Sequence, residues 1–149
     1  MAENEEYKVE FPGVKGPRFK IAIAGEPAIG KTTLARRFTG KQMRDEYIPT
    51  LGVEITTKKI KLVSKTVTLV LWDLAGQPQF KIVRPTYYKG STGVIFVFDV
   101  TMPHTLARID DWVSECYNAI ENVPGVLVGN KIDLEESRVV DRATAEARA

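Results

Sequence analysis

Apolar residues follow two different spacings along this sequence, and the two spacings alternate. Short apolar or alternating runs predict β-strands at residues 19–24, 53–62, 66–72, 93–99 and 125–129. Apolar residues three or four positions apart predict helices from Lys31 to Gly40 and over about 103–121, and a last helix begins within 138–149. Strands that alternate with helices favour an α/β domain built on an open, mostly parallel sheet.

Local signals mark where several of these elements begin, end or face the core. Gly40 is the expected stop of the first helix, and Asp141 is the expected N-cap of the last one. The apolar stripe of the longest predicted helix is formed by Leu106, Ile109, Val113, Cys116 and Ile120. Residues 1–17 predict a flexible leader, and the folded domain is expected over 18–149.

Composition narrows the class of protein without identifying it. With 149 residues, 44% of them hydrophobic and 27% charged, the chain has the balance of one globular domain. A single cysteine excludes a disulfide framework, and a net charge of +2 gives no reason to expect nucleic-acid binding. No apolar run is long enough to span a membrane and no secretory leader is recognisable, so we expect a cytoplasmic protein.

The first chemical motif is the segment Gly25–Thr32, which fits the pattern G-x-x-x-x-G-K-[ST] between a predicted strand and a predicted helix. In this context main-chain N–H groups cradle phosphates, Lys31 reaches the β- and γ-phosphates, and the Thr32 hydroxyl ligates Mg²⁺. Pro27 lacks an N–H and makes the cradle one donor poorer. The expected nucleotide-binding residues here are Gly25, Glu26, Pro27, Ala28, Ile29, Gly30, Lys31, Thr32 and Thr33.

Residues of two later segments complete this phosphate chemistry. Asp73 follows a predicted strand and suits a Mg²⁺ role through a water, and Thr50 offers a second hydroxyl ligand. The N–H of Gly76 can approach the γ-phosphate, and the amide of Gln77 can orient an attacking water. Taken alone, each of these residues could simply belong to a turn or an exposed loop.

Asn130–Asp133, with the sequence Asn-Lys-Ile-Asp, follows the last predicted strand and indicates which base is bound. The Asp133 carboxylate can accept from two adjacent N–H groups of guanine, an edge that adenine lacks, while Asn130 and Lys131 frame the loop and the ring. The four residues alone could form an ordinary capped turn. Their place behind the other motifs favours guanine.

The motifs described above, together with Tyr87–Ser91, have the order and spacing found in Ras-superfamily small GTPases, which the chain therefore resembles. Among the families of that superfamily, the chain resembles the Rab proteins most. The resemblance implies a three-layer P-loop NTPase fold and a molecular switch that binds GTP or GDP with Mg²⁺ and hydrolyses GTP slowly. It implies catalytic roles for Lys31 and Gln77, with switch I at about 43–52 and switch II at about 74–88. Effectors, exchange factors and GTPase-activating proteins are the implied partners.

The resemblance also implies an apolar effector surface at Ile55, Trp72 and Tyr87, for which ordinary packing is the alternative. The chain departs from the family pattern in two places. Met43 replaces the aromatic residue that covers guanine, and Pro78 and Gln79 stand where Rab proteins usually carry an acidic and a basic residue, with Pro78 stiffening the chain beside Gln77. The family's last guanine-contacting loop, sixth strand, final helix and lipid-bearing cysteine tail have no counterpart. We therefore expect an incomplete domain with an exposed strand edge at 126–128, weaker nucleotide binding, and membrane association only through a tail or partner.

Other interpretations stay open for several features. Pro27 and Pro78 also fit a nucleotide-gated binding module with negligible hydrolysis, whereas a P-loop kinase or ATPase is disfavoured by Asn130–Asp133. We expect His104 in the first turn of a helix and Cys116 in the core. The lysines at 58, 59, 61 and 65 predict a solvated strand edge, with a membrane or partner patch as the alternative.

Overall fold

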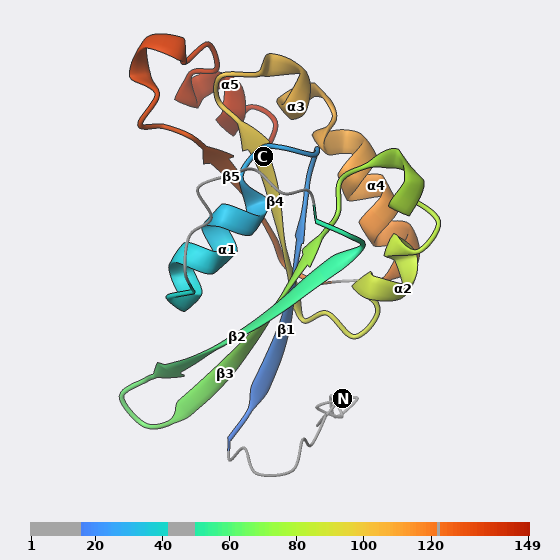
Figure 1. Cartoon of the computed structure of the whole chain (residues 1–149), viewed down its shortest axis with the longest axis vertical. Helices are drawn as coiled ribbons and strands as arrows, with labels where there is room; N and C mark the ends of the chain where they lie inside the picture. The colour runs from blue at the N-terminus through green and yellow to red at the C-terminus, as the bar shows by residue number, and fades with distance from the viewer. Residues whose placement is uncertain (1–15, 42–49, 122) are drawn as a thin grey trace.

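The computed structural model, which describes residues 16–41, 50–121 and 123–149, contains one five-stranded sheet (Figure 1). Its strands are β1 (Arg18–Ala24), β2 (Val53–Lys61), β3 (Thr66–Leu74), β4 (Gly93–Asp99) and β5 (Gly125–Asn130), in the order β2-β3-β1-β4-β5. The pair β2 and β3 is antiparallel and the remaining pairs are parallel. The predicted open, mostly parallel sheet is therefore confirmed.

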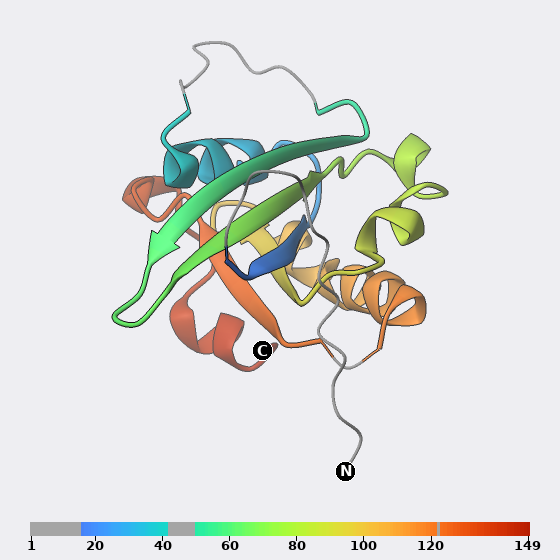
Figure 2. The same ribbon diagram turned by 90° about the horizontal axis from the view of Figure 1, so that it is seen from below.

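Helices lie on both faces of the sheet and divide the core into two clusters (Figures 1 and 2). They are α1 (Lys31–Thr39), α2 (Arg84–Tyr88), α3 (Pro103–Ala107), α4 (Ile109–Ala119) and α5 (Arg142–Glu146), with short 3-10 turns η1 (Pro78–Phe80) and η2 (Glu135–Ser137). Ala35 of α1 packs on Ile23 and Val97 on one face. On the other face, Trp112 and Cys116 of α4 belong to the larger cluster, which Ala145 of α5 also joins.

The helix predicted over about 103–121 is in fact two helices. Arg108 separates α3 from α4, with φ −80° and ψ −7°, and its N–H turns back onto the carbonyls of His104 and Leu106. The apolar stripe nevertheless survives the break, because Leu106, Ile109 and Cys116 are all buried. Apolar spacing therefore located the buried face and missed the break between the two helices.

Several local predictions are confirmed. Gly40 ends α1 in the left-handed region at φ 74°, and the Asp141 side chain caps α5 by accepting from the Thr144 N–H at 2.7 Å. Cys116 is buried, and His104 lies in the first turn of α3. The strand expected at 66–72 runs on to Leu74, because it stays paired with β2.

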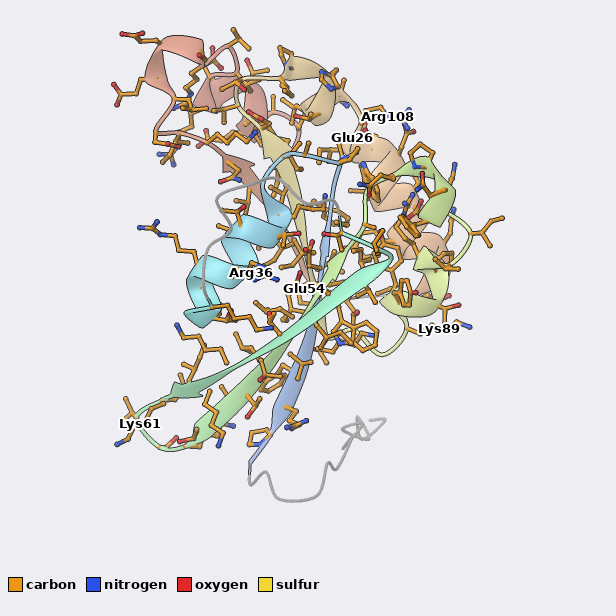
Figure 3. The ribbon with its side chains drawn as sticks, viewed as in Figure 1. Glu26, Arg36, Glu54, Lys61, Lys89 and Arg108 are labelled. Atoms are coloured by element: carbon orange, nitrogen blue, oxygen red, sulfur yellow. The ribbon has the colours of Figure 1, made fainter. Side chains whose placement is uncertain are left out.

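The two sheet edges have different character. Lys59, Lys61 and Lys65 are exposed along β2 and its turn (Lys61 is labelled in Figure 3), whereas Lys58 lies over the Phe38 ring at 4.4 Å. At the other edge no strand in the described part of the chain pairs with the outer side of β5, and Val126 is 56% exposed. The exposed edge expected at 126–128 is thus present. None of the helices among the described residues has the length and apolar character needed to cross a bilayer.

Candidate nucleotide-binding site

The predicted site residues converge at the carboxyl ends of the parallel strands (Figure 1). The phosphate loop, Gly25–Thr32, follows β1, and residues 75–77 follow β3. The base loop, Asn130–Asp133, starts at the end of β5. In parallel α/β sheets this edge is where ligands bind, since several loops open onto it together.

The phosphate loop leads directly into the first turn of α1. Gly30 is the N-cap residue at φ 91°, and a Cβ there would lie 2.5 Å from the Asn130 side-chain nitrogen, so the position needs glycine for both conformation and space. Because a glycine cap has no side chain to occupy the first N–H groups of α1, they are free to bind an anion.

Lys31 is buried within this loop, with 6% of its surface exposed, and its Nζ donates to the Glu26 carbonyl at 2.7 Å. Burial lowers the pKa of Lys31 to about 8, while the charges of Asp73 and Glu26 act in the opposite direction. Phosphate oxygens placed beside this ammonium would replace the water it has lost and favour its charged form.

Thr32, Thr50 and Asp73 come together beside Lys31. The two hydroxyl oxygens are 2.7 Å apart, and the Thr32 hydroxyl donates to Asp73 Oδ2. Asp73 is 1% exposed, burial raises its pKa, and its Oδ1 atom has no hydrogen-bond partner among the described residues. Hard oxygen donors around an unsatisfied buried carboxylate fit Mg²⁺, which completes its shell with waters and phosphates.

Carboxylates alone could not hold a metal ion here. No group of three or more His, Cys, Asp or Glu side chains able to hold a metal occurs within residues 16–41, 50–121 and 123–149. A cation at Asp73 therefore depends on the two threonine hydroxyls and on oxygens brought by a ligand.

Switch II, residues 74–88, begins in close contact with the phosphate loop. A Cβ on Gly76 would lie 2.5 Å from the Gly25 carbonyl oxygen and 2.6 Å from the Pro27 nitrogen. The next residue, Gln77, has an extended backbone, and its buried Oε1 has no hydrogen-bond partner among the described residues. Switch II is also joined to switch I, because the Ala75 N–H donates to the Gly52 carbonyl at 2.9 Å.

Sequence reasoning missed Arg84, which is buried at the start of α2. Its Nε and Nη2 donate to the two oxygens of Glu115 at 2.6 and 2.9 Å, and its Nη1 donates to the carbonyls of Ala75 and Gln77 at 3.1 Å each. The ion pair joins residues 31 positions apart. No local pattern of apolar or charged residues could have indicated it.

The side chain of Glu26 has contacts that sequence reasoning did not identify. Its side chain does not extend the phosphate cradle, because its Oε1 accepts from Trp112 Nε1 at 2.9 Å and from Arg108 Nε at 3.3 Å. Figure 3 shows Glu26 and Arg108 side by side. Only the main chain of Glu26 therefore remains available to bind a phosphate.

The base loop is joined to the phosphate loop. Asn130 Nδ2 donates to the Ile29 carbonyl at 2.8 Å, and Lys131 Nζ donates to the Ala28 carbonyl at 3.2 Å. Lys131 also pairs with the buried Asp99 at 2.8 Å, a partner that sequence reasoning did not identify. Burial acts to raise the pKa of Asp99, but hydrogen bonds from Lys131 and Thr101 bring it below the usual value. Asp133 is exposed in the following turn.

The three residues of the predicted effector surface lie next to each other. Ile55 is 46% exposed and pairs with Trp72 in the β2–β3 ladder, and the rings of Trp72 and Tyr87 are 6.3 Å apart. Lys20 Nζ lies 3.6 Å from the centre of the Trp72 ring and donates to the carbonyl of Lys89, which Figure 3 labels. Whether this surface binds a partner stays a prediction.

Two predictions fall outside the described residues. Met43, the expected cover of the guanine, belongs to the undescribed segment 42–49, which includes most of switch I. Residues 1–15 of the expected leader are outside the description as well.

Comparison with known proteins identifies the family. The model of the Ras family matches residues 20–149. Ras-related protein Rab-1A of Dictyostelium discoideum is 40% identical over 132 residues, which are 88% of this chain and 65% of that relative. The chain thus spans just under two thirds of the length of the curated relative it matches. Together with the five-stranded Ras-like sheet, the match shows that this chain belongs to the Ras family.

Proposed function

We propose that this chain is a guanine-nucleotide switch that binds GTP or GDP with Mg²⁺ and hydrolyses GTP slowly. The observation that carries the proposal is the direct contact between two loops, in which Asn130 and Lys131 of the base loop donate to main-chain oxygens of the phosphate loop. A ligand with a base at one end and phosphates at the other would engage both loops at once.

The phosphate end of the ligand would meet Lys31 and the N–H groups at the start of α1. Thr32 and Thr50 would hold Mg²⁺ directly and Asp73 would hold it through a water. When bound, the ion neutralises charge on the β- and γ-phosphates. At the other end, the Asp133 carboxylate would accept from the two adjacent N–H groups of guanine.

For hydrolysis, Gln77 would orient a water for in-line attack on the γ-phosphate, and Lys31 would stabilise the developing charge. The Arg84 guanidinium is taken up by Glu115 and by main-chain oxygens, so it is not aimed at the phosphates. The sequence motifs place no arginine where one would be expected to reach the transferred group, so turnover is expected to be slow until a partner supplies one.

Single-turnover GTP hydrolysis by the parent chain and by Gln77→Leu tests this role. We expect the variant to be slower by roughly tenfold or more, because it can no longer orient the water. GDP affinity is the internal control and should stay unchanged, since Gln77 serves only the reacting water. Equal hydrolysis rates would remove Gln77 from the mechanism, and displacement of bound GDP by ADP as readily as by GTP would remove guanine specificity.

A binding module with negligible hydrolysis is the second candidate. It is favoured by Pro78, which starts η1 directly after Gln77, and by Pro27, which has no N–H to offer a phosphate. Timing GTP turnover with and without a candidate GTPase-activating protein separates the two functions. Turnover indistinguishable from that of free GTP under both conditions would favour the module.

In either case Ile55, Trp72 and Tyr87 are the proposed contact surface for effectors. Ile55 is the test position, because it is half-exposed and holds no part of the site. Ile55→Asp should abolish capture of proteins that bind the GTP-loaded but not the GDP-loaded chain, at unchanged GDP affinity. Undiminished capture would favour the packing interpretation of these three residues.

A further inference from the structure

One face of α4, extended by its N-cap residue Arg108, carries three side chains with polar partners outside the helix. Arg108, Trp112 and Glu115 are four and three positions apart, so they follow a single stripe along the helix. At one end this stripe meets the phosphate loop, and at the other it meets switch II. The helix thus lies against both segments that must cooperate at the γ-phosphate.

The phosphate-loop contact is made through Glu26. Its carboxylate accepts from the indole Nε1 of Trp112 at 2.9 Å and from Arg108 at 3.3 Å. The loop that holds the phosphates is therefore fixed to α4 by a charged acceptor with two donors.

The switch II contact is made through Arg84. Glu115 binds its guanidinium with both oxygens, Tyr88 Oη donates to the same carboxylate, and the guanidinium lies 4.4 Å from the centre of the Trp112 ring. Nη1 then donates to the carbonyls of Ala75 and Gln77. These two carbonyls flank Gly76, so one rigid group holds both sides of the peptide segment that carries Gln77.

The chemistry of this arrangement calls for arginine. The Arg84 side chain is 4% exposed, and a buried cation is costly unless all its donors are matched. A planar guanidinium can bind a carboxylate with two parallel bonds and still direct a third nitrogen at the carbonyls. Lysine keeps the charge, but its three donors share one nitrogen, so it cannot form the two parallel bonds to Glu115 while a separate nitrogen holds the two carbonyls.

We propose that Arg84, held by Glu115 and Trp112 of α4, is a positioning residue that fixes the main chain of residues 75–77 so that Gln77 presents its amide to the attacking water. The inference rests on the hydrolytic function proposed above. It adds that this alignment is set from α4, and that Glu26 fixes the phosphate loop against the same helix. Arg84 acts through Gln77 and does not touch the nucleotide.

The decisive experiment compares single-turnover GTP hydrolysis in Arg84→Lys, Gln77→Leu and the double variant, with GDP affinity measured for each. Arg84→Lys should hydrolyse at least about tenfold more slowly than the parent while its GDP dissociation constant changes by less than about threefold. In the double variant the lysine should cause no further loss beyond that of Gln77→Leu, since a positioning residue has nothing left to position.

Two further variants keep the test decisive if Arg84→Lys fails to fold. Glu115→Gln keeps the size of the side chain but weakens its bonds to Arg84, and it should slow hydrolysis in the same way. Arg142→Ala removes an exposed arginine that pairs with Glu146 of the same helix, and it should match the parent. The inference would be overturned if Arg84→Lys or Glu115→Gln hydrolysed GTP at the rate of the parent while Gln77→Leu was slow. The inference would also be overturned if the hydrolysis rate of the double variant fell by the product of the two single effects. A Gln77→Leu as fast as the parent would instead refute the proposed hydrolysis.

Discussion

Gly76 shows how little space separates the two segments that would surround a γ-phosphate. Its Cα faces main-chain atoms of Gly25, Glu26 and Pro27, and a single added carbon would lie within 2.7 Å of each of those residues. Backbone atoms cannot turn aside as a flexible side chain can. A methyl group here must therefore push switch II and the phosphate loop apart.

We predict that Gly76→Ala lowers the free energy of unfolding by roughly 1–3 kcal/mol and weakens GTP binding more than GDP binding. Chemical denaturation and nucleotide titration measure the two effects. Gly40→Ala is the matched control: its residue has positive φ with nothing within 4 Å, so it should lose stability through backbone strain alone and keep its nucleotide preference. If Gly76→Ala were as stable as the parent chain, that result would contradict the close contact between switch II and the phosphate loop.

At the scale of elements, α5 is a short helix that depends on its cap. It spans Arg142–Glu146, too few residues to be stable on helix propensity alone. Asp141 accepts from the Thr144 N–H, and this hydrogen bond lowers the pKa of Asp141 below its usual value. Through Val140 and Ala145 the segment also reaches the larger core cluster, so the cap supports part of the core.

The cap should make thermal stability depend on pH. The folded-state pKa of Asp141 is lowered, so the stability it confers is present above the unfolded pKa of about 3.9 and is lost as the pH falls through the folded pKa. Asp141→Ala should therefore melt below the parent at pH 7, and the gap should narrow as the pH falls below the unfolded pKa. Asp141→Asn caps without titrating and should stay near the parent at pH 7. A gap that is constant with pH would show that the charge of Asp141 adds nothing to the cap.

Elements also show what a sequence can and cannot reveal. Neighbouring residues determine where the phosphate loop lies along the chain, where α1 ends at Gly40 and where Asp141 caps α5. Local patterns were therefore enough to predict these features. The break at Arg108 was missed, because apolar spacing continues across it. The contacts of Arg84 with Glu115 and of Glu26 with Trp112 join residues 31 and 86 positions apart. Only the folded arrangement of α4 against two loops brings such pairs together.

For the whole molecule, the most consequential surface is the β5 edge. Val126 is 56% exposed, and in the described chain the outer side of β5 pairs with no other strand. Unpaired main-chain groups beside an exposed valine favour pairing with another chain. The opposite edge, β2, is protected by lysines.

We predict concentration-dependent self-association of this chain, relieved by Val126→Lys. A lysine at this half-exposed position keeps the strand and adds a charge that disfavours edge pairing. Sedimentation velocity over a range of protein concentrations measures the effect, and Thr57→Lys on the other edge strand is the control, which should associate like the parent. A parent that stays monomeric at all concentrations would contradict the prediction.

The hydrogen bond between the Ala75 N–H and the Gly52 carbonyl has a further consequence for the order of events in the proposed switch. It closes the open end of the β2–β3 hairpin, with Thr50 two residues before one partner and Gln77 two residues after the other. A regulator that pulls Thr50 away from Asp73 must first break this bond or carry the end of β3 with it. Release of the metal and loss of water alignment would then be a single mechanical event.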